Sequence, residues 1–252
     1  MSFDVAADAY DNFMGRYSRL LVGQMADLAG VKPGQRVLDV GCGPGALTRE
    51  LVERVEAENV VAVDPSESFV EAVRERLPGV TVLQASAERL PLPDGWFDAA
   101  LAQLVVHFMA DPIAGLVEMK RVARPGGVVA ACVWDHGGGM GPLGLFWRAA
   151  RELDPKAEDE SGLAGSREGH LAELFAAAGL QDLVETIVAA DLEHATFADW
   201  WQPFTQGVGP AGAYVASLDA ARRDELREAC RRLLPDGPFV VPARAWAVSG
   251  RA

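Results

Sequence analysis

The feature that most constrains the fold is a set of three glycines that directly follows a short apolar segment. Residues 37–45 read Val-Leu-Asp-Val-Gly-Cys-Gly-Pro-Gly. Glycines permit positive φ angles and let a ligand approach the backbone closely. A helix that begins near Ala46 would point its free amide groups at the same place. The pattern therefore predicts a β-strand that turns tightly into a nucleotide-binding site.

A second apolar segment, Asn59 to Asp64, ends in an acid and predicts a second short strand. A βαβ unit brings such a carboxylate to the hydroxyl groups of a ribose. The glycine spacing is GxGxG, whereas dinucleotide-binding folds typically have GxGxxG. This difference argues against a nicotinamide-dependent oxidoreductase, which stays as an alternative. A plain turn is the other interpretation of the glycines.

Four segments in this order resemble the class I S-adenosylmethionine-dependent methyltransferases, and specifically the group that includes the ubiquinone and menaquinone biosynthesis enzymes. They are the glycine segment and residues 84–92, 97–107 and 121–133. The resemblance implies a doubly wound, mostly parallel, seven-stranded Rossmann-like α/β sheet with helices on both faces. It also implies S-adenosylmethionine as cofactor, S-adenosylhomocysteine as product, and O-, N- or C-methylation of an acceptor. A non-catalytic S-adenosylmethionine-binding protein is a further alternative, because fold does not fix function.

The resemblance implies a set of cofactor-binding residues at the carboxyl ends of the strands. The glycines and Gln103 would lie at the methionine moiety, Asp64 at the ribose, and Ala87 with Glu88 at the adenine. The full set is Asp39, Gly41, Gly43, Gly45, Asp64, Pro65, Ser66, Ser86, Ala87, Glu88 and Gln103. Ser86 departs from the family, which commonly has Asp there, so its contact with adenine would carry less charge assistance. Glu88 is alternatively a solvated loop acid.

The amino-terminal residues 1–35 are expected to form a helical segment over the cofactor. Residues 10–21 resemble a stretch that precedes the glycines in many relatives. Arg16 or Tyr17 would then reach the methionine carboxylate, Arg16 by a bidentate contact. The alternative is an ordinary surface helix.

Several residues are candidates for the acceptor side of the site. His107 follows the predicted fourth strand, and an imidazole with an ordinary pKa near 6.5 suits a general base. A histidine held only by structural hydrogen bonds is the alternative. Trp134, Asp135 and His136 end the predicted fifth strand and are expected to contact substrate.

The chain is expected to be a single domain over residues 1–252, with a cofactor-binding core at 36–135 and substrate-side insertions at 136–182 and 195–236. The second insertion holds Trp200 and Trp201 and a predicted amphipathic helix at 219–234. We predict that it forms a helical cap whose tryptophans contact substrate. The alternatives are that these tryptophans only anchor the insertion by packing, or that they lie in a dimer interface.

The remaining elements alternate as in a doubly wound sheet. Strands are predicted near 36–40, 59–64, 80–85, 97–104, 127–134, 183–191 and 239–248, and helices near 46–56, 67–77, 111–123 and 168–178.

The composition of the chain limits which binding partners and which cellular location are expected. A formal net charge of -13 disfavours nucleic acid, which needs a basic surface. The three cysteines are scattered and predict neither a disulfide framework nor a metal site. No apolar run approaches the roughly 20 residues that a membrane span needs, and residues 1–11 lack the apolar core of a secretory signal. We therefore expect a cytoplasmic monomer or homodimer that acts on a small-molecule methyl acceptor, without metal and without membrane association.

Overall fold

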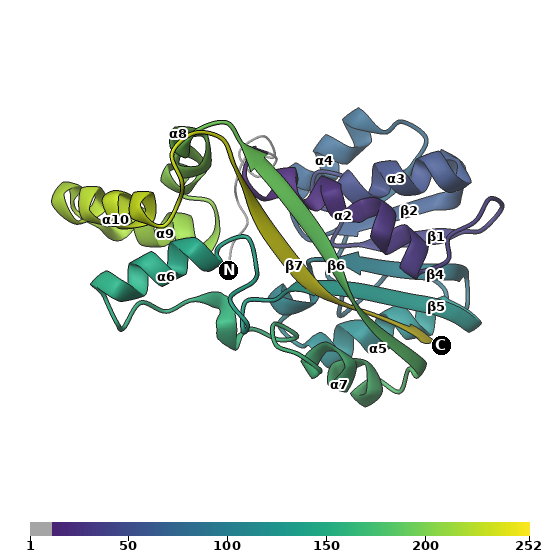
Figure 1. Ribbon diagram of the computed structural model, residues 1–252. Helices are drawn as coiled ribbons and strands as arrows, with labels where there is room; N and C mark the ends of the chain where they lie inside the picture. Colours follow the sequence, from purple (N-terminus) through teal and green to yellow (C-terminus); the bar gives the residue numbers. More distant parts are fainter. Residues whose placement is uncertain (1–11) are drawn as a thin grey trace.

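The computed structural model describes residues 12–252, which fold around one seven-stranded sheet (Figure 1). The strand order is β3-β2-β1-β4-β5-β7-β6. The first five strands pair in parallel, and β7 runs antiparallel to both β5 and β6. The strands are β1 (Val37–Val40), β2 (Val60–Asp64), β3 (Thr81–Gln84), β4 (Phe97–Gln103), β5 (Ala123–Trp134), β6 (Gln181–His194) and β7 (Phe239–Arg251). The predicted fold class is confirmed.

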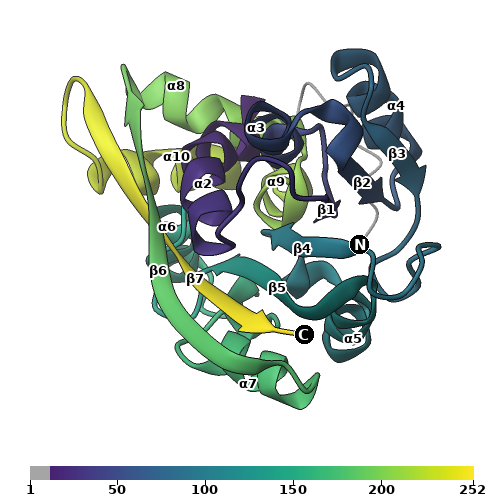
Figure 2. The ribbon, with the colours of Figure 1, turned by 90° about the vertical axis from the view of Figure 1, so that its right-hand side faces the viewer.

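The central strands are apolar because helices cover both faces of the sheet (Figure 2). Every residue of β1 and β2 is buried. One face packs against α2 (Met14–Leu28) and α3 (Ala46–Val55), and the other packs against α5 (Pro112–Val122) and α7 (His170–Ala177). In a smaller apolar cluster, α4 (Glu67–Arg76) packs against β2 and β3. Short 3-10 turns are η1 (Ala57–Asn59), η2 (Val106–Phe108) and η3 (Glu160–Gly162).

The strand order reverses between β1 and β4, so the chain leaves these two strands toward opposite sides. Ligands of open α/β sheets bind in the crevice outside the carboxyl ends of strands at such a point. The glycine segment follows β1 there, and residues 104–111 follow β4. The fold thus brings the two segments to one edge of the sheet.

A separate helical layer lies beyond that edge, and we call it the cap (Figure 1). Its elements are α6 (Gly144–Leu153), α8 (Phe197–Trp201), η4 (Gln202–Gln206), α9 (Gly209–Ser217) and α10 (Ala220–Arg232). They pack around an apolar cluster of their own that includes Phe146, Trp200 and Phe204. The side chain of Asp219 caps α10 by accepting from the amide of Arg222, near the start predicted for this helix.

The predicted strand boundaries differ most from the structure in β5, β6 and β7; β7 ends at Arg251, three residues beyond its predicted end. Strand β6 extends three residues beyond its predicted end, to His194, because β7 pairs with it up to Phe239. Strand β5 begins at Ala123 rather than near 127, because Phe97 of β4 pairs with Ala123 before a register shift. The long β6 and β7 pair reaches from the sheet into the cap (Figure 1).

Candidate active site

The glycine segment turns sharply at three positive φ angles: +70° at Gly41, +51° at Gly43 and +94° at Gly45. A Cβ atom at Gly41 would lie 2.5 Å from both γ-carbons of Val105, whereas one at Gly43 would meet nothing within 4 Å. Gly41 is therefore required by packing as well as by its backbone. Gly43 faces open space, where a ligand can approach the main chain.

We expect Gly41→Ala and Gly43→Ala to have different effects. Both alanines suffer the strain of a positive φ angle. Gly41→Ala adds overpacking against Val105 and should lower the free energy of unfolding by about 1 to 3 kcal/mol more than Gly43→Ala. Gly43→Ala should instead weaken binding of the cofactor. Urea unfolding and ligand titration of both variants test this; equal stabilities would contradict the packing role of Gly41.

Asp64 lies at the end of β2 and holds the neighbouring loop. Its Oδ2 accepts from the Gly43 amide at 2.9 Å and its Oδ1 from the Ser66 amide at 2.8 Å. Burial raises the pKa of this carboxyl even though both bonds oppose the rise. Each oxygen retains a lone pair, so the two hydroxyl groups of a ribose fit this group. Pro65 follows, and its carbonyl accepts from Gln84.

A cavity of about 360 Å³, partly open to solvent, lies against the glycine segment. Asp39 lines it and is buried; Thr48 Oγ1 donates to its Oδ2 at 2.6 Å. Burial, and secondarily the charge of Asp64, raises the pKa of Asp39 to about 7, against the opposing bond from Thr48. We call this space the cofactor cavity.

Gln103 lines the same cavity from the end of β4. Its Nε2 donates to the Ser18 carbonyl at 3.1 Å, but its buried Oε1 has no hydrogen-bond partner among the described residues. A buried acceptor without a donor is costly. An ammonium group such as that of a methionine moiety would supply the missing donor, so the residues present fit S-adenosylmethionine.

The segment 86–88 holds a loop. Glu88 Oε1 accepts from the amide of Ala110 at 2.8 Å and from that of Asp111 at 3.4 Å. Ser86 is exposed, and Ala87 is buried against the core. Glu88 is therefore more than a solvated loop acid. Its side chain holds the loop that follows β4 and that includes His107. The contact of these residues with adenine stays a prediction.

The structure gives Arg16 and Tyr17 partners other than the predicted cofactor. The two terminal guanidinium nitrogens of Arg16, Nη1 and Nη2, donate to the carboxylate of Asp199 at 3.2 Å, as a bidentate pair. The hydroxyl of Tyr17 lies 3.3 Å from His194 Nε2, and His194 Nδ1 lies 3.2 Å from Asp199. Neither residue lines the cofactor cavity; Gly15 and Ser18 of the same helix do. These contacts link α2 to the cap, and the contact of Arg16 or Tyr17 with the methionine carboxylate stays a prediction.

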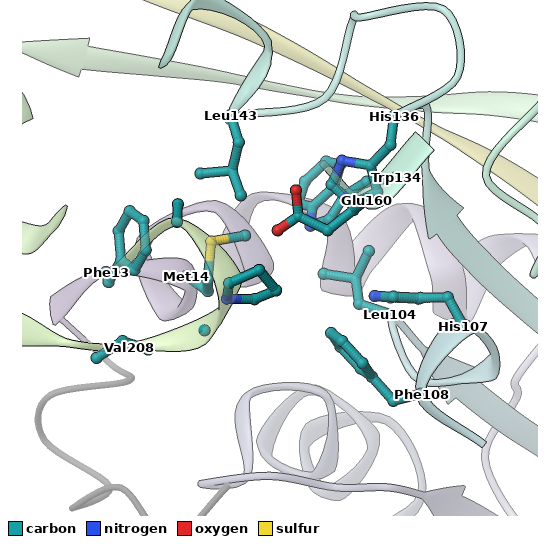
Figure 3. A pocket seen from close by; sticks show the side chains of 13 residues that line it. Phe13, Met14, Leu104, His107, Phe108, Trp134, His136, Leu143, Glu160 and Val208 are labelled. Atoms are coloured by element: carbon teal, nitrogen blue, oxygen red, sulfur yellow. The ribbon is translucent and has the colours of Figure 1, made fainter. Parts of the chain in front are cut away.

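A second cavity of about 490 Å³, also open to solvent, lies between the sheet edge and the cap (Figure 3). We call it the acceptor cavity. Its lining is Phe13, Met14, Leu104, His107, Phe108, Trp134, His136, Leu143, Glu160 and residues 208–211. Residues adjacent in the chain line the two cavities: Met14 and Leu104 line the acceptor cavity, and their neighbours Gly15 and Gln103 line the cofactor cavity. Leu104 has a φ of +62°, a strained conformation of the kind that gathers at functional sites.

His107, Trp134 and His136, three predicted residues, meet in the acceptor cavity. The rings of His107 and His136 lie 6.1 Å apart, and Nδ1 of His107 is buried without a partner among the described residues. Burial, assisted by His136, holds the pKa of His107 well below its ordinary value. Burial also lowers the pKa of His136 to about 4, against the opposing charges of Asp159 and Asp135. Both imidazoles are therefore held in the neutral form, in which one ring nitrogen of each carries a lone pair.

Asp135, Trp200 and Trp201 do not line the acceptor cavity, contrary to prediction. Asp135 Oδ1 accepts from the Gly138 amide at 2.7 Å and so shapes the glycine-rich turn. Trp200 and Trp201 are 2% and 7% exposed and pack against Phe204 inside the cap. Both tryptophans thus pack within the cap, and their contact with substrate stays a prediction. The cap contributes to the cavity through residues 208–211 instead.

Glu160 was not anticipated from the sequence, because it lies in an acidic segment that reads as a solvated loop. It is 5% exposed, and its Oε2 has no hydrogen-bond partner among the described residues. Burial raises the pKa of Glu160 to about 7. The one sequence signal was the apolar stretch before it, which forms α6 and carries the segment over the sheet edge.

We expect Glu160→Gln to change how stability depends on pH. The folded protein holds a proton on Glu160 that the unfolded chain releases near pH 4.5, so this group costs stability as pH rises from about 4.5 to 7. Glutamine removes that cost. Relative to the wild type, the variant should gain about 2 kcal/mol of unfolding free energy between pH 5 and pH 8. Urea unfolding at both pH values measures this; a difference that does not change with pH would contradict the raised pKa.

Within residues 12–252 no cluster of three or more His, Cys, Asp or Glu side chains has the arrangement of a metal site. No helix in that range is long and apolar enough to cross a membrane.

Comparison with known proteins agrees with this geometry. Residues 38–131 match the family described as Methyltransferase domain. A malonyl-(acyl-carrier protein) O-methyltransferase of Serratia marcescens is 32% identical over 147 residues, 58% of this chain and 56% of that protein. A demethylmenaquinone methyltransferase of Beutenbergia cavernae is 38% identical over 101 residues, 40% of this chain and 41% of that protein.

The fold also matches a solved S-adenosylmethionine-dependent methyltransferase of Aquifex aeolicus. The TM-score is 0.56 at 24% identity, over 75% of this chain and 94% of that one. The chain spans about half the length, or less, of the curated relatives it matches first. Within these bounds, residues 38–131 match a methyltransferase domain, and the chain is similar in this region and in fold to S-adenosylmethionine-dependent methyltransferases.

Proposed function

We propose that this chain transfers the methyl group of S-adenosylmethionine to a small, largely apolar acceptor. The observation that carries the proposal is the pair of adjoining cavities. The cofactor cavity has the glycine segment, Asp39 and an unpaired Gln103 oxygen. The acceptor cavity lies beyond Gln103 and Leu104 and is lined mostly by apolar and aromatic side chains. A donor and an acceptor in these two spaces would be held close together.

In this proposal the cofactor supplies an electrophilic methyl group on a sulfonium. Asp64 would bind its ribose, and the glycine segment together with Gln103 would hold its methionine part. Methyl transfer is an in-line displacement, so most of the protein's contribution is positioning and exclusion of water. The cap supports exclusion of water because its residues 208–211 line the acceptor cavity.

His107 is the candidate general base where the acceptor is a hydroxyl group. Its imidazole extends into the acceptor cavity (Figure 3), and its lowered pKa keeps it neutral at pH 7. Its unpartnered Nδ1 leaves it a lone pair or a proton to share with substrate, according to tautomer. An acceptor that already carries a free lone pair needs no such base.

The test is a turnover assay with S-adenosylmethionine labelled on its methyl carbon and a panel of small alcohols, phenols, amines and carboxylic acids. The proposal expects S-adenosylhomocysteine to form only when an acceptor is present, with the label recovered in that acceptor. Cofactor binding without turnover on any acceptor would favour the non-catalytic alternative. A His107→Ala variant that keeps the wild-type kcat on a hydroxyl acceptor would remove the assignment of the base.

A further inference from the structure

The acceptor cavity contains a buried carboxyl group that the methyl-transfer scheme above does not use. Glu160 enters the cavity from η3, and its buried Oε2 has no hydrogen-bond partner within residues 12–252. Figure 3 shows the carboxylate pointing into the same space as the imidazole of His107. A buried polar atom without a partner costs free energy. The burial of Glu160 in this cavity therefore indicates a role for its carboxyl group.

The walls around Glu160 define what such a group can bind. Trp134, Phe108 and Phe13 bring aromatic surface to the cavity, and Leu143 and Leu104 bring aliphatic surface. Flat apolar molecules bind well between such side chains. The polar side chains that line the cavity are Glu160, His107 and His136.

We propose that Glu160 is the specificity-determining residue of the acceptor cavity, and that it selects flat apolar acceptors that carry a hydrogen-bond donor, either a hydroxyl group or an amine. This rests on the proposed function, because it assigns the cavity to the acceptor. A carboxylate accepts hydrogen bonds and cannot donate them. An acceptor with an O–H or N–H group pairs with Oε2, whereas one of the same shape without a donor leaves that oxygen desolvated and unpaired.

The side chain of Trp147 offers a competing explanation for the buried carboxyl group of Glu160. A small hollow lined by Glu160 is also lined by Trp147. The indole of Trp147 acts on the Glu160 carboxyl as a hydrogen-bond donor and opposes the rise of its pKa. Among the described residues, neither Trp147 Nε1 nor Glu160 Oε2 has a partner with full hydrogen-bond geometry. If Glu160 served only Trp147, its removal would change stability and leave ligand preference unaltered.

The experiment measures dissociation constants by ligand-observed NMR at pH 8.5, where Glu160 is ionised, with saturating S-adenosylhomocysteine. The probes are 2-naphthol, which carries a donor, and 2-methylnaphthalene, which has nearly the same shape without one. We expect the wild type to bind 2-naphthol about tenfold more tightly or better. Glu160→Leu should abolish the preference. Glu160→Gln, which keeps a neutral acceptor oxygen, should retain a reduced one and covers the case in which the leucine variant does not fold.

Trp147→Phe is the matched control and should keep the wild-type preference. Equal affinities of the wild type for the two probes, or a preference that survives unchanged in both Glu160 variants, would overturn the inference. The affinity for S-adenosylhomocysteine is measured first on the same samples. If the wild type does not bind it, the proposed function fails; if it binds and the probes are not distinguished, only the role of Glu160 fails.

Discussion

Asp64→Ala is expected to weaken S-adenosylhomocysteine binding by about 100-fold, close to 3 kcal/mol. The substitution removes the carboxylate that would accept from the ribose, and hydrogen bonds to charged groups contribute about 1.5 to 3 kcal/mol each. It also frees the amides of Gly43 and Ser66 that Asp64 now holds at 2.9 and 2.8 Å. Isothermal titration calorimetry of the variant and the wild type measures the effect.

The matched control for Asp64 is Asp94→Ala. Asp94 has a side chain that is 79% exposed and pairs with Arg121, and it lies before β4 rather than at the carboxyl end of a strand. Its removal should leave affinity for S-adenosylhomocysteine within about twofold, because exposed ion pairs contribute little. If Asp64→Ala bound as well as this control, Asp64 would not be the ribose-binding residue.

Trp200→Ala is expected to lower the free energy of unfolding by about 3 to 5 kcal/mol, as large-to-small changes of buried aromatic residues do. Trp200 is 2% exposed, and its ring lies 4.9 Å from Phe204 and 5.9 Å from Phe197, between centroids. Deleting it leaves a cavity in the cluster that holds α6, α8 and α9 together. Urea unfolding followed by circular dichroism measures the loss.

Trp96→Ala supplies the comparison for Trp200. Trp96 is 41% exposed and lies under the guanidinium of Arg36 at 4.4 Å, so its removal should cost only about 1 kcal/mol. A stable Trp200→Ala whose defect is a raised KM for the acceptor would contradict the packing role and restore the prediction that Trp200 contacts substrate.

The sequence predicted the sheet well because buried parallel strands are short, apolar and bounded by glycines or acids. The segments at 37–45 and 59–64 predicted strands β1 and β2 and the turn that follows β1. Parallel pairing then forces the carboxyl ends of β1, β2 and β4 to one edge, so Asp39, Gly41 and Gln103 could be placed together. His107, Trp134 and His136 were brought together by the same geometry.

The cap was harder to predict, because the contacts within it are between segments far apart in the sequence. Exposed aromatic residues such as Trp200 and Trp201 would be typical of a binding surface. In the structure both are buried in the apolar cluster of the cap, which also contains Phe146 and Trp147 of α6. Arg16 has the chemistry to bind a carboxylate and does so, but the carboxylate is that of Asp199. Glu160 resembles its exposed acidic neighbours in sequence, and only the position of α6 and η3 over the sheet edge buries it.

The most direct test of the central claim is a calorimetric titration of the wild-type protein with S-adenosylmethionine, S-adenosylhomocysteine and NADH. The account predicts micromolar binding of the first two at one site per chain and no binding of NADH at the same concentrations. Tighter binding of NADH, or no binding of either sulfur compound, would contradict the assignment of the cavity beside Gly43 and Asp64.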